Sequence, residues 1–212
     1  MYMASTRIIR PLSTILVVLI CLATAGVACS NETDTTLTSQ QESIQKYLEG
    51  SHQPRLIPEA ELGSSLDDQP QYYTQWGLDI FRYISTMYAE GRDSLPIAEN
   101  GDILSITYTA YIFTGNAPSI ANMYATNDSA SIEQLQQAGL NTEYEWTTDP
   151  YEFMLGNGDV LDSLDITLEG CHKGDSVEVY LTFEGGYGND YIGKVPSKSS
   201  VVWFITINDI KK

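Results

Sequence analysis

The sequence has few positive charges and few histidines. It holds 11 Lys and Arg against 28 Asp and Glu over 212 residues, which gives a formal net charge of -17. Binding to nucleic acid requires clustered Lys and Arg that contact phosphates, and the absence of such a cluster excludes this class of partner. The two histidines, His52 and His172, have no Cys or carboxylate at metal-ligand spacing. We therefore expect neither a metal site nor another cofactor.

Cysteine is also scarce, with three residues at positions 21, 29 and 171. This number and spacing fit neither a disulfide framework nor a metal-binding knuckle. Cys171 is followed by His172, but adjacent side chains of a regular element do not face each other. We expect Cys171 to be a small packed residue rather than a reactive thiol. No nucleophile-elbow motif is present either, so the chain shows no motif for covalent catalysis.

The first 28 residues are typical of an export signal. Arg7 and Arg10 precede an apolar run over 15–22, and small residues follow up to Ala28. The apolar run is shorter than the roughly 20 residues that a membrane-spanning helix needs. The segment is therefore interpreted as a targeting signal rather than as part of the folded body.

The residues just before Cys29 resemble a bacterial lipoprotein box. Gly26, Val27 and Ala28 are small, although Gly26 stands where this box usually has an aliphatic residue. The resemblance implies acylation of Cys29, and with it a lipid anchor in the bacterial cell envelope, with sorting to the outer membrane. The alternative is ordinary cleavage near Ala28 without a lipid.

The segment after Cys29 changes character near residue 40. Residues 29–39 are almost entirely polar and predict a flexible tether. Ser39 and Glu42 have the spacing of a capping box, which predicts a short helix over about 40–49. Residues 51–70 are rich in Pro and Gly and indicate an irregular connection. We expect an N-terminal extension over 40–75.

Alternating apolar residues predict strands in the remainder of the chain. Three clear strands are expected at 103–113, 175–183 and 200–210, and a short helix over about 160–168. The stretch 76–90 fits a helix or a strand, and its Tyr and Ile content favours a strand. These elements predict an α+β fold in which a curved antiparallel sheet, with one face closed, packs on one short helix.

A long insertion at about 115–149 separates the first two clear strands and is expected to hold a small helix near 131–138. Connections of this length are often functional or mobile. Glycines at 156–158 and 185–188 lack the strand-to-helix context and the Lys of a phosphate-binding loop. They are interpreted as tight turns that need positive φ angles.

Several short motifs, taken together, resemble the FKBP-type peptidyl-prolyl isomerases. The resemblance covers about 76–212 and is strongest from 151 to 207. The motifs occur in the order and at the spacing of that family, and they are Gly101-Asp102, Ile106 to Thr109, Tyr151 to Gly156, Val160-Leu161, Leu168 to Asp175, Gly186-Tyr187-Gly188 and Val195-Pro196. This resemblance implies an FKBP-like domain that binds proline-containing polypeptide clients and needs no cofactor.

The resemblance also assigns pocket residues. Tyr108, Tyr187 and Trp203 take the catalytic positions, and the Tyr187 hydroxyl and the Leu161 amide are expected to donate hydrogen bonds to substrate carbonyls. Leu164 forms the floor of the pocket. The other expected substrate-binding residues are Tyr151, Phe153, Val160, Leu161, Tyr191 and Val195, of which Tyr191 and Val195 belong to a flap.

The chain departs from the family at three pocket positions. Leu164 stands where the family commonly has Trp, and Trp203 replaces a smaller Phe. The best match to the family's Phe-Asp pair is Tyr124-Ala125, so the Asp that borders the pocket is lost. Two functions therefore remain open: an isomerase of envelope proteins, and a non-catalytic binding or chaperone-like module that reuses the fold.

Overall fold

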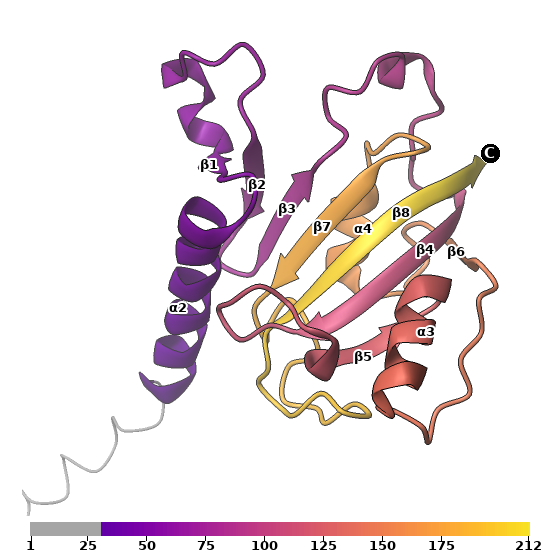
Figure 1. Cartoon of the computed structure of the whole chain (residues 1–212). Helices are drawn as coiled ribbons and strands as arrows, with labels where there is room; N and C mark the ends of the chain where they lie inside the picture. Colours follow the sequence, from indigo (N-terminus) through magenta and orange to yellow (C-terminus); the bar gives the residue numbers. More distant parts are fainter. Residues whose placement is uncertain (1–30) are drawn as a thin grey trace, which may run out of the picture. The chain divides into compact units, whose positions relative to one another are not determined.

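One mixed sheet of eight strands dominates the computed structural model, which describes the backbone of residues 31–212 and the side chains from residue 35 onward (Figure 1). The strand order is β1-β2-β3-β7-β8-β4-β5, and β6 pairs with β4 as well. All pairings are antiparallel except the short parallel pair of β1 and β2. The strands are β1 (Ile57–Pro58), β2 (Tyr72–Trp76), β3 (Ile80–Ile84), β4 (Ile103–Ile112), β5 (Met123–Thr126), β6 (Tyr151–Met154), β7 (Ser176–Leu181) and β8 (Val201–Lys211).

Three α-helices accompany the sheet in the described part of the chain, namely α2 (Asn31–Lys46), α3 (Ser129–Ala138) and α4 (Asp162–Leu168). A π-helical turn, Tyr47–Ser51, continues α2. In α3, the Asp128 side chain caps the first turn by accepting a hydrogen bond from Ser131 N at 2.8 Å. The predicted helices at 131–138 and 160–168 correspond to α3 and α4, and the three predicted strands to β4, β7 and β8.

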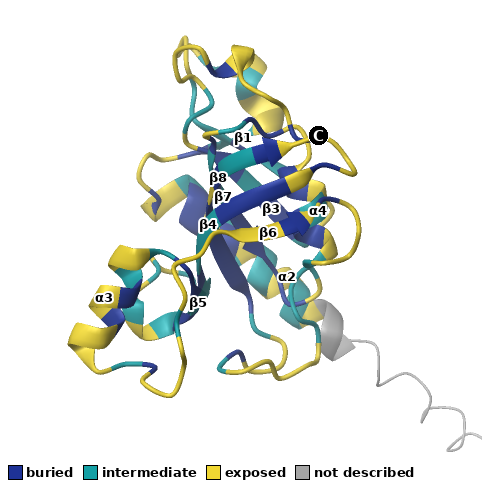
Figure 2. Cartoon of the chain, turned by 90° about the vertical axis from the view of Figure 1, so that its right-hand side faces the viewer, coloured by how far each residue is buried: buried dark blue, intermediate teal, exposed yellow. Residues whose placement is uncertain are grey.

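The main hydrophobic core lies between the sheet and α4, which is drawn behind the sheet in Figure 1. Alternate residues of β4, β7 and β8 point into it, as period-two alternation in a strand requires. Leu104, Val179 and Val201 are each fully buried there. Figure 2 shows this concentration of buried residues on the central strands, whereas α3 is largely exposed. The predicted α+β class, with a sheet packed on one short helix, is confirmed.

The opposite face of the sheet is also partly closed, contrary to the expectation of a single closed face. Ile44 of α2 and Leu48 of the π turn form a second buried cluster with Phe81, Tyr180 and Val202 of the strands. Tyr180 of β7 and Val202 of β8 are fully buried apolar side chains on this face. They therefore need cover on this face too, and the N-terminal extension provides it.

The N-terminal extension is part of the sheet rather than an appendage to it. Strands β1 and β2 add to the edge of β3, so the sheet begins before residue 76, the boundary expected from the sequence. The ambiguous stretch 76–90 contains strand β3 and turns. Helix α2 begins at Asn31, within the 29–39 segment that was expected to be a tether.

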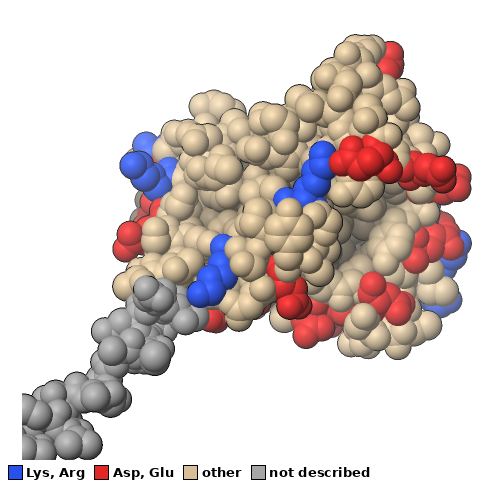
Figure 3. Space-filling view, turned by 90° about the horizontal axis from the view of Figure 1, so that it is seen from below, with Lys and Arg blue, Asp and Glu red and all other residues tan. Residues whose placement is uncertain are grey.

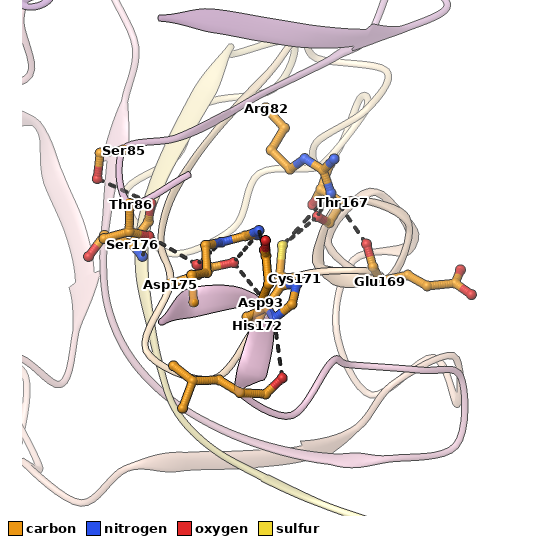
Figure 4. A network of polar contacts seen from close by, with 12 residues as sticks. Arg82, Ser85, Thr86, Asp93, Thr167, Glu169, Cys171, His172, Asp175 and Ser176 are labelled. Carbon is orange, nitrogen blue, oxygen red and sulfur yellow. Dashed lines mark hydrogen bonds and ion pairs between the residues drawn. The ribbon is translucent and has the colours of Figure 1, made fainter. Parts of the chain in front are cut away.

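A buried ion pair fastens the long β3–β4 connection to the start of β7. Arg92 donates from Nε and Nη2 to the two carboxylate oxygens of Asp175, each at 2.7 Å. Asp175 also accepts from the backbone N of His172 at 2.7 Å and from Thr86 Oγ1 at 3.0 Å (Figure 4). Because all these donors converge on one buried carboxylate, the connection is held in a single conformation.

The predicted export signal and Cys29 lie outside the described residues. In the part of the chain that is described, no helix combines the length and the apolar character needed to cross a membrane.

Candidate functional site

A cavity of about 390 Å³ opens on the α4 side of the sheet. Most of the pocket residues expected from the sequence meet in it, although they come from separate strands and loops. Its lining is aromatic and aliphatic with one carboxylate, and consists of Tyr108, Tyr151, Asp159, Val160, Leu161, Leu164, Tyr187 and Trp203. A mainly apolar concave surface with a few polar groups is the usual form of a ligand site.

Two aromatic rings from neighbouring strands form one wall of the cavity. Tyr108 lies on β4 and Trp203 on β8, where Ala110 is the direct partner of Trp203. Tyr108 and Trp203 are thus diagonal neighbours on one face of the sheet, within reach of aromatic side chains. Their rings stack with centroids 5.0 Å apart. The alternation of residues in the two strands therefore places both rings on the pocket side.

The position of Tyr108 also depends on Asn127, which is buried where β5 ends. Asn127 Oδ1 accepts from Tyr108 N at 2.7 Å, and its Nδ2 donates to Ile106 O and Asp149 O at 3.0 Å each. One amide side chain therefore joins β4 to Asp149, at the end of the polar insertion. Sequence reasoning missed this residue, since an Asn in a polar stretch gives no signal of its burial.

The floor of the pocket is the beginning of α4. Leu164 is 1% exposed there, and the pocket also includes Leu161 just before the helix. Leu161 O accepts hydrogen bonds from Leu164 N at 2.8 Å and Asp165 N at 3.2 Å. The Leu161 N–H donates to no group of the described residues. It belongs to the set of amides that a helix start leaves without an internal partner, and it is available to an acceptor in the pocket.

Tyr187 reaches the pocket from the loop between β7 and β8. Ser163 Oγ of α4 donates to Gly185 O at 2.6 Å and holds this loop beside the helix. A side chain at Gly185 would come within 2.9 Å of Asp79 O, so the close approach of the loop requires glycine there. The expected positive φ is found at Gly188, at 62°, but not at Gly185 or Gly186.

The hydroxyl of Tyr187 meets a second phenol at the back of the pocket. Tyr124 Oη lies 3.3 Å from Tyr187 Oη, and their rings form an edge contact at 6.0 Å. Burial raises the pKa of Tyr187. Burial, followed by the proximity of the Tyr187 phenol, raises the pKa of Tyr124 further. Both phenols are therefore neutral at physiological pH and carry hydrogens that can be donated.

Trp203 brings another donor to this cluster. Its indole is 9% exposed, and its Nε1–H has no hydrogen-bond partner among the described residues. Burying a hydrogen-bond donor without an acceptor costs free energy of folding, so this N–H is a further donor that an acceptor in the pocket could use. The indole ring makes an edge contact with Tyr124 at 6.2 Å.

Three residues expected at the pocket lie elsewhere. Phe153 is 4% exposed and stacks beneath Tyr151 at 5.6 Å, so it supports the wall without forming it. Val195 is fully buried in the main core. Tyr191 is 70% exposed and does not line the cavity. The two flap residues therefore do not face the cavity in this conformation.

Ala125, which the sequence comparison with the family set against its pocket Asp, packs against the main core. Tyr124 was identified from the sequence only as a departure from the family, yet it lies at the pocket through its contacts with Tyr187 and Trp203. Its strand, β5, was not predicted because Met123 to Thr126 is too short to show alternation.

Reactive groups are scarce at this site. Cys171 is fully buried, and burial raises the pKa of its thiol to about 11, so it is an unreactive packed residue as expected. No group of three or more His, Cys, Asp and Glu residues that could hold a metal occurs between residues 31 and 212. What the pocket offers is apolar surface, aromatic faces and neutral hydrogen-bond donors.

Comparison with known proteins gives one family. The family model of the FKBP-type peptidyl-prolyl cis-trans isomerases matches residues 96–208. No curated protein matches the chain. The matched region includes every residue that lines the pocket. Since it covers more than half of the chain, the protein belongs to the FKBP-type peptidyl-prolyl cis-trans isomerase family.

Proposed function

We propose that this protein catalyses cis–trans isomerisation of X–Pro peptide bonds in polypeptide clients. The observation that carries this function is the apolar, aromatic pocket with the unpartnered N–H of Leu161 in its lining. The pocket contains no nucleophile with an adjacent base, and this reaction requires none. It requires a site that binds the twisted amide more tightly than the planar one.

The physical basis is the loss of amide resonance. Rotation about the C–N bond has a barrier of about 18–20 kcal/mol because the planar form is conjugated. Twisting removes charge from the carbonyl oxygen, and an apolar pocket lined by Trp203, Tyr108 and Leu164 favours that less polar state. Each tenfold acceleration requires about 1.4 kcal/mol of preference for it.

Neutral donors at the pocket hold the client in place. The Leu161 N–H and the Tyr187 hydroxyl are suited to bind carbonyl groups on either side of the proline. Both are fixed by the protein, Leu161 by the start of α4 and Tyr187 by its contact with Tyr124. Preorganised donors of this kind lose little entropy when the client binds.

We also propose export and a lipid anchor at Cys29, which would direct the activity to envelope proteins of a bacterium. The support is the sequence alone: Arg7 and Arg10, the apolar run and the small residues before Cys29. Mass spectrometry of the N-terminal peptide from a bacterial host tests this proposal. An acylated Cys29 in the wild type, and its loss in Cys29→Ser, are expected. An intact, unmodified N-terminus contradicts it.

A second candidate, a non-catalytic module that binds proline-containing segments, is favoured by one specific observation. By the resemblance of the sequence to the family, Ala125 takes the position of the family's pocket Asp, which would leave the site without one polar partner. Such a module would bind peptides with the same pocket and leave their isomerisation rate unchanged.

A protease-coupled assay on a Leu-Pro peptide, together with calorimetric titration of the same peptide, separates the two candidates. The isomerase predicts acceleration that Tyr187→Ala reduces strongly. Tyr88→Ala, a matched change at a tyrosine outside the pocket, should leave the rate unchanged. Saturable binding without acceleration by the folded wild type supports the module and contradicts the isomerase.

A further inference from the structure

The pocket has one charged lining residue, Asp159, at its exposed rim. Its carboxylate accepts hydrogen bonds from Met154 N at 3.2 Å and from Asn157 Nδ2 at 3.1 Å. Both donors are neutral, and Asp159 forms no ion pair within the described residues. Its negative charge is therefore fixed in position by the turn but is not compensated.

Most of the pocket lining comes from an acidic segment of the chain. Between Arg92 and Lys173 the sequence has no Lys or Arg, whereas Asp and Glu recur throughout. All the pocket-lining residues except Tyr187 and Trp203 come from this segment. Figure 3 shows large patches of Asp and Glu toward the right-hand side of the face seen from below.

Of the two lysines on the loop after Tyr187, Lys194 and Lys198, the one nearer to Tyr187 in the sequence has an acidic partner of its own. Lys194 is paired with Glu143 at 3.3 Å and lies over the Tyr144 ring. Both partners belong to the 115–149 insertion, so this lysine is already engaged. A carboxylate at the mouth of an apolar cavity, on a segment rich in Asp and Glu, attracts cations and repels anions.

We propose that the pocket selects X–Pro segments that carry a Lys or Arg next to the proline. This inference rests on the proposed function, which supplies the X–Pro substrate. It specifies in addition the charge of the residue beside the proline. The apolar walls hold the proline ring, and the rim carboxylate of Asp159 receives the cationic side chain. For a partly exposed ion pair the preference should amount to about a two- to fivefold gain over a neutral residue.

Three peptides that differ only in the residue beside the proline test this preference, with Lys, Gln or Glu at that position. Both kcat/KM for isomerisation and the Kd from calorimetry are measured, at low and at high salt. The expected order of preference is Lys, then Gln, then Glu. The differences should shrink as salt screens the charges. Equal kcat/KM and equal Kd values for the three peptides at low salt overturn the proposal.

Two variants with the same change in net charge locate the effect. Asp159→Asn should bring the Lys-to-Glu ratio close to one. Asp68→Asn, on the connection between β1 and β2, should leave that ratio as in the wild type. If both variants lower the ratio equally, the preference comes from net charge and the assignment to Asp159 is wrong.

The same measurements distinguish failure of this inference from failure of the proposed function. Isomerisation of all three peptides at one rate removes the charge preference and leaves the isomerase intact. Binding that follows the expected order without isomerisation keeps the preference and removes the isomerase. Melting curves of both variants establish that each compared sample is folded.

Discussion

Tyr124 Oη lies 3.3 Å from Tyr187 Oη, so two phenols form a pair at the back of the pocket. One hydroxyl donates to the other, and the second keeps its hydrogen for an acceptor in the pocket. Tyr124 is the more buried of the two and the one whose pKa is raised further. A buried donor polarises its partner, which strengthens the hydrogen bond that Tyr187 offers to a client carbonyl.

Removal of the Tyr124 hydroxyl tests this arrangement. Tyr124→Phe should lower kcat/KM by roughly three- to tenfold, because a hydrogen bond contributes about 1 kcal/mol and the ring itself remains. Tyr111→Phe, a half-buried tyrosine on the other face of the sheet, is the matched control and should leave kcat/KM unchanged. Equal activity of Tyr124→Phe and the wild type would show that the phenol pair does not orient the client.

The loop after Tyr187 is fastened to the insertion by Lys194. This residue donates to Asn141 Oδ1, pairs with Glu143 and lies 5.9 Å from the centre of the Tyr144 ring. Asn141 in turn donates to Met123 O of β5 at 3.0 Å. A continuous set of contacts thus connects the insertion, β5 and the pocket loop.

Lys194→Met should release the loop while keeping the aliphatic part of the side chain. Amides of residues 189–195 are then expected to exchange hydrogen faster than in the wild type, as measured by mass spectrometry. Lys198→Met, on the same loop, has no side-chain ion pair to lose in the described chain and should change exchange little. Similar exchange in both variants would contradict a fastening role for Lys194.

His52 makes the attachment of the N-terminal extension sensitive to pH. Its Nδ1 faces Pro54 O and its Nε2 faces Glu178 Oε2 at 2.9 Å, so two acceptors require both nitrogens to carry hydrogen. Burial lowers the pKa of His52, but the hydrogen bonds with Glu178 and Pro54 raise it by more. The net pKa lies above the usual 6.5.

Because the folded pKa is raised, the stabilisation is complete below about pH 6.5 and is lost as pH rises through the folded value. Unfolding in urea should show that the difference in free energy between the wild type and His52→Gln decreases from pH 5.5 to 8.5. In a Glu178→Gln background this pH dependence should largely disappear. A stability difference between the wild type and His52→Gln that grows with pH would contradict the protonated state assigned to His52.

The Arg92–Asp175 pair predicts a large loss of stability from one substitution. Burial alone raises the pKa of Asp175, but Arg92 and the His172 amide lower it by more, so the carboxylate is charged. Arg92→Met leaves that charge buried without its partner and should cost about 3 kcal/mol of unfolding free energy.

A second substitution separates the ion pair from simple packing. Adding Asp175→Asn to Arg92→Met removes the orphaned charge and should restore part of the stability. Lys173→Met, which breaks a pair with Asp209 at the surface, should change stability little. If the double variant is less stable than Arg92→Met, the unpaired charge is not the cause of the loss.

The elements with clear periodicity could be predicted from the sequence. Strands β4, β7 and β8 alternate over enough residues to show which face is buried, and the spacing of Leu161, Leu164 and Leu168 identifies α4. The same alternation places Tyr108 and Trp203 on one face. The resemblance to the family placed Tyr187 and Leu161 at the same pocket.

The remainder depends on contacts between distant residues, which no local pattern records. The cover over Phe81 and Tyr180 comes from α2, more than thirty residues earlier than Phe81. Asn127 and Arg92 are ordinary polar residues in the sequence and are buried only because their partners surround them. The flap expected around Tyr191 and Val195 does not face the pocket, because Val195 pairs with Ile192 across a tight turn and is buried in the main core.

The most direct test of the central claim is exchange NMR on a Leu-Pro peptide in the presence of a small amount of the protein. Cis–trans exchange should be much faster than in the peptide alone. It should return toward the uncatalysed rate when Trp203 is replaced by Ala in a sample that remains folded. Exchange at the uncatalysed rate with folded wild-type protein would contradict the central claim.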